Sequence, residues 1–304
     1  MGINSLSNML SFSVGKISRL ALRTLSIINF FFHYPYFGKR SSINGKTFNS
    51  VVFRLDDIPY DSAIYDEARI NVDLSVMDIF SKRNQNLTLG LVVRYLELHP
   101  RLLVSIVHGY SKGIFELALH GWDHDDYSKL TIMDQERSLL NAKTKLEHLF
   151  GNSSKIFIPP YNKFNRFTIN AMKKLGIKII SSSVYSDYHL FFMANNPKNK
   201  SPSNYIYHLP EMVSFEAFKG ARPIPIPLEQ IVSNVERHIS KYGYAIITIH
   251  PQSFVKFTES NSTSLSLKES ILDIDQITQL DLLIQMLLDK NIRITSFTKL
   301  VGLD

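Results

Sequence analysis

From Ser50 onward, short apolar runs alternate with longer stretches whose apolar positions recur at helical spacing. The short runs, rich in Val, Ile, Leu and Phe, predict buried strands, and the periodic stretches predict amphipathic helices. The predicted strands are 51–55, 87–93, 115–120, 155–158, 177–182, 244–250 and 292–297; the predicted helices are 72–83, 101–110, 131–150, 167–176, 228–242 and 274–290.

One helix carries explicit signals at both of its ends. Thr131 and Asp134 have the spacing of a capping box before the 131–150 helix, and Gly151 stands just past its last residue. Strands that alternate with crossover helices imply a parallel sheet covered by helices, either doubly wound or closed into a barrel.

No linker composition or repeat interrupts residues 46–304, so we expect one catalytic domain preceded by a segment of residues 1–45. Two stretches inside the domain lack apolar periodicity. Residues 195–204 are rich in Pro and Asn, and residues 258–270 are rich in Ser and Thr. We expect both to be long loops at the rim of a site.

Net charge is unevenly distributed along the 304 residues, which carry a formal charge of +7. Residues 1–55 contain seven basic residues and no acid, so basic and acidic residues balance in the rest of the chain. Because the basic character belongs to the N-terminal segment and not to a face of the folded domain, it does not indicate nucleic-acid binding.

The N-terminal segment predicts a helix over residues 8–32. Lys16, Arg19 and Arg23 recur at helical spacing, which turns them toward solvent or lipid headgroups. Such a helix suits either peripheral contact with an anionic membrane surface or packing across the bottom of a barrel. The apolar run 24–37 is too short for a membrane span, which needs about 20 residues. The segment also lacks a convincing cleavage site for export, so a cytoplasmic or membrane-surface location is favoured and export stays open as an alternative.

Polar residues gather where four predicted strands end. Asp56 and Asp57 follow the strand 51–55, His120 and His124 follow 115–120, the residues Pro-Pro-Tyr-Asn follow 155–158, and His250 ends 244–250. The chain has no cysteine, so any metal ion must be held by His, Asp or Glu. Parallel α/β folds build their active sites from the loops at these strand ends.

Each motif alone has an ordinary structural explanation. An Asp-Asp pair after a strand is usually a turn or a cap, and a single His at a strand end is more often structural than a ligand. All four motifs, in this order and each on a separate strand end, favour one shared site. An aspartate pair is also unfavourable unless a cation lies near it.

These motifs carry a resemblance to a known family. "FRLDDIP", "LALHGWDH", "FIPPYN" and "ITIHP" resemble the successive motifs of polysaccharide deacetylases of the NodB-homology type, carbohydrate esterase family 4. The resemblance spans residues 51–250 and is closest to the branch with HGxxH and PPYN motifs. It implies a distorted (β/α) barrel, here of about seven parallel strands, with one divalent metal ion, usually zinc.

The resemblance also implies a role for each motif residue. Asp56 matches the general base, His250 the general acid, and Tyr161 a backbone N–H that binds the oxyanion. Asp57, His120 and His124 match the metal ligands. One carboxylate and two imidazoles suit a catalytic zinc site with open positions, and a second carboxylate and an imidazole can transfer protons.

The chain departs from the family pattern at several positions. Ile158 stands where the third motif has an Arg that braces the catalytic aspartate, and Gly121 replaces a small hydroxyl residue. Asp187 is a weak candidate for the fourth motif. The candidates to replace the missing Arg are Arg54, Lys163 and Arg222.

Several polar residues near the motifs have simpler explanations than chemistry. Trp122 is either a platform on which a sugar stacks or a packing anchor. The residues set aside as structural or solvated are Asp125, Asp126, His208 and Glu211.

The leading hypothesis is a metal-dependent hydrolase that removes an acyl group from an N-acylated sugar of a glycan or glycoconjugate. Two alternatives stay open: hydrolysis of a small non-sugar amide by the same chemistry, or a catalytically silent glycan-binding protein on the same fold. The complete set of motif acids and histidines argues against the silent protein, and Ile158 argues mildly for it.

Overall fold

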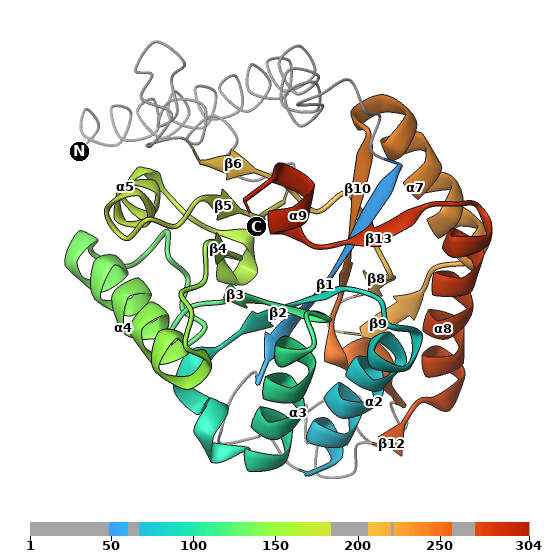
Figure 1. Ribbon diagram of the computed structural model, residues 1–304, viewed down its shortest axis with the longest axis horizontal. Helices are drawn as coiled ribbons and strands as arrows, with labels where there is room; N and C mark the ends of the chain where they lie inside the picture. The colour runs from blue at the N-terminus through green and yellow to red at the C-terminus, as the bar shows by residue number, and fades with distance from the viewer. Residues whose placement is uncertain (1–48, 60–66, 184–205, 220–221, 257–270, 304) are drawn as a thin grey trace, which may run out of the picture.

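The computed structural model describes residues 49–59, 67–183, 206–219, 222–256 and 271–303 (Figure 1). The predicted helix 8–32, the boundary at residue 45, the predicted loops 195–204 and 258–270, and Asp187 lie outside these residues. Within them, no helix is both long enough and apolar enough to cross a membrane.

Nine strands of the described chain form one curled sheet in which all hydrogen-bonded neighbours run parallel. The order across the sheet is β6-β5-β4-β3-β2-β1-β10-β7, and β13 pairs with the first residues of β1. These strands are β1 (Ser50–Ile58), β2 (Leu87–Leu91), β3 (Phe115–Leu119), β4 (Ile156–Phe157), β5 (Ile179–Ile180), β6 (Tyr207–His208), β7 (Val213–Ser214), β10 (Tyr244–Ile249) and β13 (Arg293–Thr295).

Six long helices surround the sheet on its outer side (Figure 1). They are α2 (Glu67–Arg83), α3 (Pro100–Ser111), α4 (Ile132–Phe150), α5 (Arg166–Lys174), α7 (Leu228–Tyr242) and α8 (Ile274–Asp289). The predicted ends of α4 are confirmed: the Thr131 hydroxyl accepts a hydrogen bond from the Asp134 N–H, and Gly151 ends the helix at φ 69°. Only this half of the predicted capping box forms, because the Asp134 carboxylate accepts from the Thr131 hydroxyl instead of the Thr131 backbone N–H. A glycine suits this left-handed position because it has no Cβ.

The predicted parallel α/β fold is confirmed as a curled half-barrel. All seven predicted strands exist, with small differences at their ends. The prediction was wrong between residues 206 and 225, which it treated as irregular. This stretch contains β6, β7 and the antiparallel hairpin of β8 (Glu216–Lys219) and β9 (Arg222–Pro225). Strands of two to four residues are too short to show a period in the sequence.

Short elements complete the described chain. They are the 3₁₀ helices η1 (Val93–Leu98), η2 (Pro160–Asn162) and η4 (Pro251–Phe254), the strand pair β11 (Val255–Lys256) and β12 (Ile271–Leu272), and the C-terminal helix α9 (Phe297–Val301).

The two faces of the sheet pack against different groups. In β1, Val51, Phe53 and Leu55 belong to the large core between sheet and outer helices, whereas Val52 belongs to a smaller cluster with residues of α9. Because successive side chains of a strand point to opposite faces, Arg54 and Asp56 share the inner face with Val52. The inner face is therefore apolar near the start of β1 and charged near its end.

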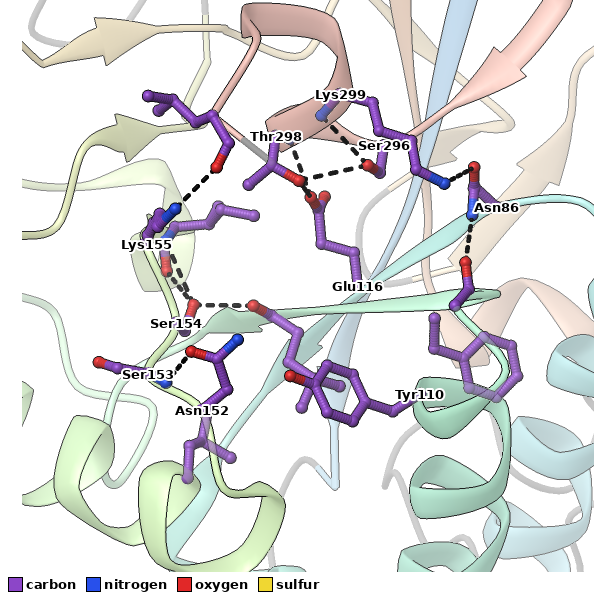
Figure 2. Close-up of a pocket in the computed structure, with 16 residues that line it drawn as sticks. Asn86, Tyr110, Glu116, Asn152, Ser153, Ser154, Lys155, Ser296, Thr298 and Lys299 are labelled. Atoms are coloured by element: carbon purple, nitrogen blue, oxygen red, sulfur yellow. Dashed lines mark hydrogen bonds between the residues drawn. The ribbon is translucent and has the colours of Figure 1, made fainter.

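Helix α9 closes the amino end of the half-barrel. Phe297, Leu300 and Val301 are buried in the inner cluster. Beside α9 lies a cavity of about 220 Å³, lined by residues that precede or begin β3 and β4 (Figure 2). The motif residues lie at the opposite, carboxyl end of the strands, so this cavity is separate from them.

Candidate metal centre

The Asp56-Asp57 pair lies on a β-bulge at the end of β1. The pairing of β1 with β2 shifts register between Leu55 and Ile58, and Asp57 has a φ of 64°. In a regular strand the two carboxylates would point to opposite faces of the sheet, but a bulge inserts a residue and redirects its side chain. Asp56 consequently stays on the inner face while Asp57 reaches toward the histidines that follow β3.

Asp57, His120 and His124 form a compact group of metal-ligand atoms. The Nε2 atoms of both histidines lie 2.9 Å from the same Asp57 Oδ1, and the three ligand atoms all lie within 4.8 Å of one another. Burial raises the pKa of Asp57, but the hydrogen bonds of His120 and His124 outweigh this effect and hold the pKa well below its usual value. The ionised carboxylate is the form that binds a metal ion.

The hydrogen-bond partner of His120 determines which ring nitrogen is available. Its Nδ1 lies 2.7 Å from the Ile158 carbonyl oxygen, which can only accept, so Nδ1 carries the proton. Nε2 then presents its lone pair to the centre, an arrangement typical of metal-binding histidines. The donor set therefore fits a divalent ion such as zinc: one carboxylate and two imidazoles, with a carbonyl that orients one ring.

The loop that carries the histidines depends on left-handed backbone. Gly121 has a φ of 86° and His124 a φ of 57°. Because a side chain at Gly121 would be strained at that φ, the replacement of a hydroxyl residue by glycine suits this turn. Of the six non-glycine residues with positive φ in the described chain, four lie in this centre: Asp57, His124, Tyr161 and Asn162. Such clusters are typical of functional sites.

Asp56 is buried and held by Arg54. The Arg54 Nη2 atom lies 2.9 Å from Asp56 Oδ2, and the two side chains are 1% and 4% exposed. The other oxygen, Oδ1, has no hydrogen-bond partner within the described residues. Gly90 on β2 faces this carboxylate, since a Cβ there would lie 3.1 Å from Oδ1.

The structure identifies which candidate cation contacts Asp56. Ile158, at the position of the family's third-motif Arg, is fully buried in the inner apolar cluster. Lys163 lies near Asp126, 3.4 Å from its carboxylate, and the side chain of Arg222 is outside the described part of the chain. Arg54, two residues before Asp56 on the same face of β1, makes the contact.

His250 is paired with an acid that the sequence did not identify. Its Nδ1 lies 2.7 Å from Glu216 Oε1, and its Nε2 lies 4.0 Å from Asp56 Oδ2. Burial alone lowers the pKa of His250, but the hydrogen bond and charge of Glu216, with the charges of Asp57 and Asp56, raise it to about 9. His250 is therefore protonated at neutral pH. Glu216 begins β8, within residues 206–225, where no strand or helix was predicted, so no signal in the sequence marked it.

Tyr161 lies at the mouth of the centre. Its side chain is 56% exposed, and its ring packs edge-on against the His124 ring, with centroids 4.7 Å apart. The structure thus brings together all six residues that the motifs predicted: Asp56, Asp57, His120, His124, Tyr161 and His250. Their assigned roles stay predictions.

Most of the polar residues that the sequence analysis explained without chemistry make packing or hydrogen-bond contacts away from the metal-ligand group. His208 is buried within hydrogen-bond distance of the Ser182 hydroxyl, and burial lowers its pKa to about 3, which keeps it neutral. Trp122 packs against the main core with Lys145 over its ring. Asp126 accepts hydrogen bonds from Ser128. Glu211 is different, because it lies against Arg54.

Comparisons with known proteins bear on the family and on the fold. The sequence model of the polysaccharide deacetylase family matches residues 46–180. A search of curated proteins found no match.

Solved structures with the same fold are distant in sequence. BA3943, a CE4 family pseudoenzyme from Bacillus anthracis, is 14% identical with a TM-score of 0.52; the match covers 84% of this chain and 66% of that one. Bc1960, a peptidoglycan N-acetylglucosamine deacetylase, is 16% identical with a TM-score of 0.51 over 84% and 89% of the two chains. A candidate polysaccharide deacetylase from Mycobacterium smegmatis is 13% identical with a TM-score of 0.57 over 84% and 90%. At these identities the likeness shows the fold alone.

Proposed function

We propose that the chain is a metal-dependent hydrolase acting on an N-acylated sugar. The motif residues and the match of residues 46–180 to the polysaccharide deacetylase family model support this proposal. The bond broken is the amide between an acyl group, acetyl in the simplest case, and the sugar nitrogen of a glycan or glycoconjugate. The fold alone does not carry this proposal, because a pseudoenzyme shares it.

One observation carries the proposal. A three-ligand group, Asp57, His120 and His124, lies beside a separate buried carboxylate and a protonated histidine at one end of the half-barrel. Asp57, His120 and His124 would hold the metal ion, for which we propose zinc. When bound there, such an ion polarises the acyl oxygen and makes water more acidic.

Asp56 is the proposed general base. Arg54 holds its Oδ2, while Oδ1 has no partner among the described residues and is available to accept a proton from the attacking water. Transfer to this carboxylate follows ordinary general-base catalysis. Gly90 leaves room for Asp56 to stay in this position.

His250 is the proposed general acid. Its Nδ1 is held by Glu216, so Nε2 is the atom that donates a proton to the sugar nitrogen as the amide bond breaks. Because the pKa of His250 is raised to about 9, the ring carries the needed proton at neutral pH. The 4.0 Å between His250 Nε2 and Asp56 Oδ2 supports the proposal that these two residues act as acid and base on one reacting group.

Tyr161 is the proposed oxyanion donor through its backbone N–H. The charge that develops on the acyl oxygen in the transition state is stabilised by donors already oriented toward it. Tyr161 has a positive φ of 57°, so its backbone N–H points in another direction than the N–H of a residue in extended conformation.

The test is to purify the protein without added metal, measure its metal content, and assay acetate release from N-acetylated oligosaccharides and from simple amides. We expect about one divalent ion per chain and release from the oligosaccharides. Acetate release from the simple amides alone would indicate a hydrolase of small non-sugar amides. Bound oligosaccharide without any release would indicate a glycan-binding protein.

A further inference from the structure

Arg54 is the centre of a hydrogen-bond network that extends beyond Asp56. Its Nη1 donates to the Ser181 carbonyl and hydroxyl oxygens at 2.9 and 2.8 Å. Its Nη2 lies within reach of three acceptors: Asp56 Oδ2 at 2.9 Å, Glu211 Oε2 at 3.1 Å and Asn162 Oδ1 at 3.3 Å. A planar guanidinium fixed at one nitrogen presents the other in a fixed direction, so these three groups are held relative to one another.

Asn162 belongs to the loop that carries the proposed oxyanion donor. Tyr161 and Asn162 are consecutive residues with φ values of 57° and 54°. Left-handed backbone is unfavourable for a residue other than glycine, although Asn tolerates it better than most. Two such residues in succession persist only where surrounding contacts stabilise them.

Glu211 connects Asn162 with Arg54. Its Oε1 accepts a hydrogen bond from Asn162 Nδ2 at 3.1 Å, while its Oε2 accepts from Arg54. Asn162, Glu211 and Arg54 thus form a closed ring of hydrogen bonds. The Glu211 backbone is itself fixed, because its N–H donates to the Ser182 carbonyl at 2.7 Å and the residue forms a bridge with Ser183.

The carboxylate of Glu211 determines which way the Asn162 amide points. A carboxylate only accepts hydrogen bonds and a guanidinium only donates them. Asn162 therefore turns its Nδ2 to Glu211 and its Oδ1 to Arg54. In the reverse orientation its amide oxygen would face the carboxylate, an acceptor against an acceptor, and its NH2 group would face the guanidinium, a donor against a donor. This restriction holds the side chain, and with it the left-handed backbone of residues 161 and 162.

We propose that Glu211 is a positioning residue that couples the Tyr161–Asn162 loop to Asp56 through Arg54. This inference rests on the proposed function, since it assigns to Glu211 the relative placement of general base and oxyanion donor. Glu211 itself touches neither the substrate nor the proposed metal ligands in this role.

The test exchanges the two partners. Glu211→Gln introduces an amide that faces Asn162 or Arg54 with a donor, and Asn162→Asp places a second carboxylate against Glu211. Each single change should lower kcat about 10–100-fold, the usual effect of removing a partner that orients a site, with KM changed less than about threefold and metal content unchanged.

The double variant restores the pattern of donors and acceptors with the two partners reversed. The new amide at position 211 can donate to the new carboxylate at position 162, while the oxygens of both side chains still accept from Arg54. We expect kcat of this variant to recover to within about fivefold of the wild-type value, because the coupled pair is complementary again.

Two outcomes would overturn the proposal: single variants with wild-type kcat, or a double variant whose loss is the product of the two single losses. Glu116→Gln is the matched control, because Glu116 is another carboxylate with several partners, at the opposite end of the sheet. It should lower the Tm and leave kcat unchanged.

A wild-type protein without metal or activity would remove the proposed function and leave this inference testable by structure. Crystal structures of the wild type and of Glu211→Ala then decide. Loss of positive φ at residues 161 and 162 in the variant supports the coupling, and unchanged backbone at both residues overturns it.

Discussion

The two ends of the curled sheet use carboxylates in opposite ways. At the amino end, Glu116 accepts hydrogen bonds from the Thr88 hydroxyl and from the backbone and hydroxyl groups at the start of α9, all at 2.6–2.9 Å. Figure 2 shows Glu116 beside Thr298. At the carboxyl end, Asp56 keeps one oxygen without a partner in the described chain, and Asp57 lies on left-handed backbone.

This difference suggests that the carboxylate at the amino end of the sheet serves stability, whereas the carboxylates at the carboxyl end serve the proposed chemistry. A carboxylate whose oxygens all accept hydrogen bonds stabilises the fold. A carboxylate left partly unsatisfied is less favourable for stability but is available to react. Barrels of parallel strands commonly divide their ends in this way, with catalysis at the carboxyl end.

The largest expected effects come from the carboxyl end. Asp56→Asn should keep the metal and lower turnover about 10²–10⁴-fold, because an amide cannot take a proton from water. His120→Ala should lose both metal and activity, because it removes a ligand. Metal content and acetate release of the purified variants check this pair. If Asp56→Asn loses the metal while Asp57→Asn keeps it, the assignments of the two acids are reversed.

The pairing of His250 with Glu216 makes a prediction about pH. The rate should fall as the pH rises through about 9, where His250 loses its proton. Glu216→Gln removes the largest effect that raises this pKa, so the alkaline limb of the pH–rate profile should move down by at least about one unit. The surface variant Glu236→Gln, which breaks only an exposed pair with Lys290, should leave the profile unchanged.

The same pKa has a consequence for stability, whose sign follows from its direction. The folded-state pKa of about 9 lies above the ordinary 6.5 of histidine. The pairing therefore stabilises the fold fully below pH 6.5 and loses this contribution as the pH rises through 9. Unfolding measured between about pH 6 and 10 should show this loss in the wild type and a smaller loss in Glu216→Gln.

Gly90→Ala tests the space around Asp56. The added Cβ would lie 3.1 Å from Asp56 Oδ1 and 3.2 Å from its Cα, so the carboxylate of the proposed general base must shift. We expect kcat to fall about 10-fold, since small displacements of catalytic groups lower rates strongly. Gly113→Ala at the amino end is the comparison: it has open space but a φ of 69°, so it should lower the Tm and keep kcat. Equal kcat losses in the two variants would contradict this.

Glu116→Ala tests the amino end directly. Removal of the carboxylate leaves the first N–H groups of α9 without their acceptor, which costs about 2 kcal/mol where water only partly replaces it. For a domain of this size the Tm should fall by about 4–8 °C. Activity measured at about 25 °C should stay within about twofold of wild type, and a large loss of activity would mean that the two ends are coupled.

The smallest expected effect concerns Asp73 on α2, which is fully buried with neither carboxylate oxygen paired among the described residues. Burial, and then the charge of Asp57, raise the pKa of Asp73 well above its usual value. Because its folded-state pKa is raised, Asp73 destabilises the fold once the pH exceeds 3.8, the pKa of an ordinary Asp. Asp73→Asn should therefore raise the free energy of unfolding by about 1 kcal/mol at neutral pH, or the Tm by about 2–4 °C. The gain should disappear below pH 3.8, and its persistence there would contradict the cause given.

Much of this protein could be predicted by reading along the chain. The order of strands and helices follows from apolar periodicity, which depends on local side-chain geometry, and the end of the sheet at which the motif residues lie follows because parallel strands bring their carboxyl ends to one edge. The composition of the candidate metal-ligand group could also be predicted from the sequence, because a protein without cysteine can offer a metal ion only His, Asp and Glu.

The partners of those residues depend on the packed structure. The bulge that brings Asp57 into the same site as Asp56 depends on the pairing of β1 with β2, not on the two Asp residues being adjacent in sequence. Arg54 meets Glu211 across 157 residues, and His250 meets Glu216 from a hairpin with no periodic signal. These contacts form because the sheet curls and gathers the inner-face side chains of separate strands around one axis. That curvature is a collective property of the packed sheet and is absent from any single segment.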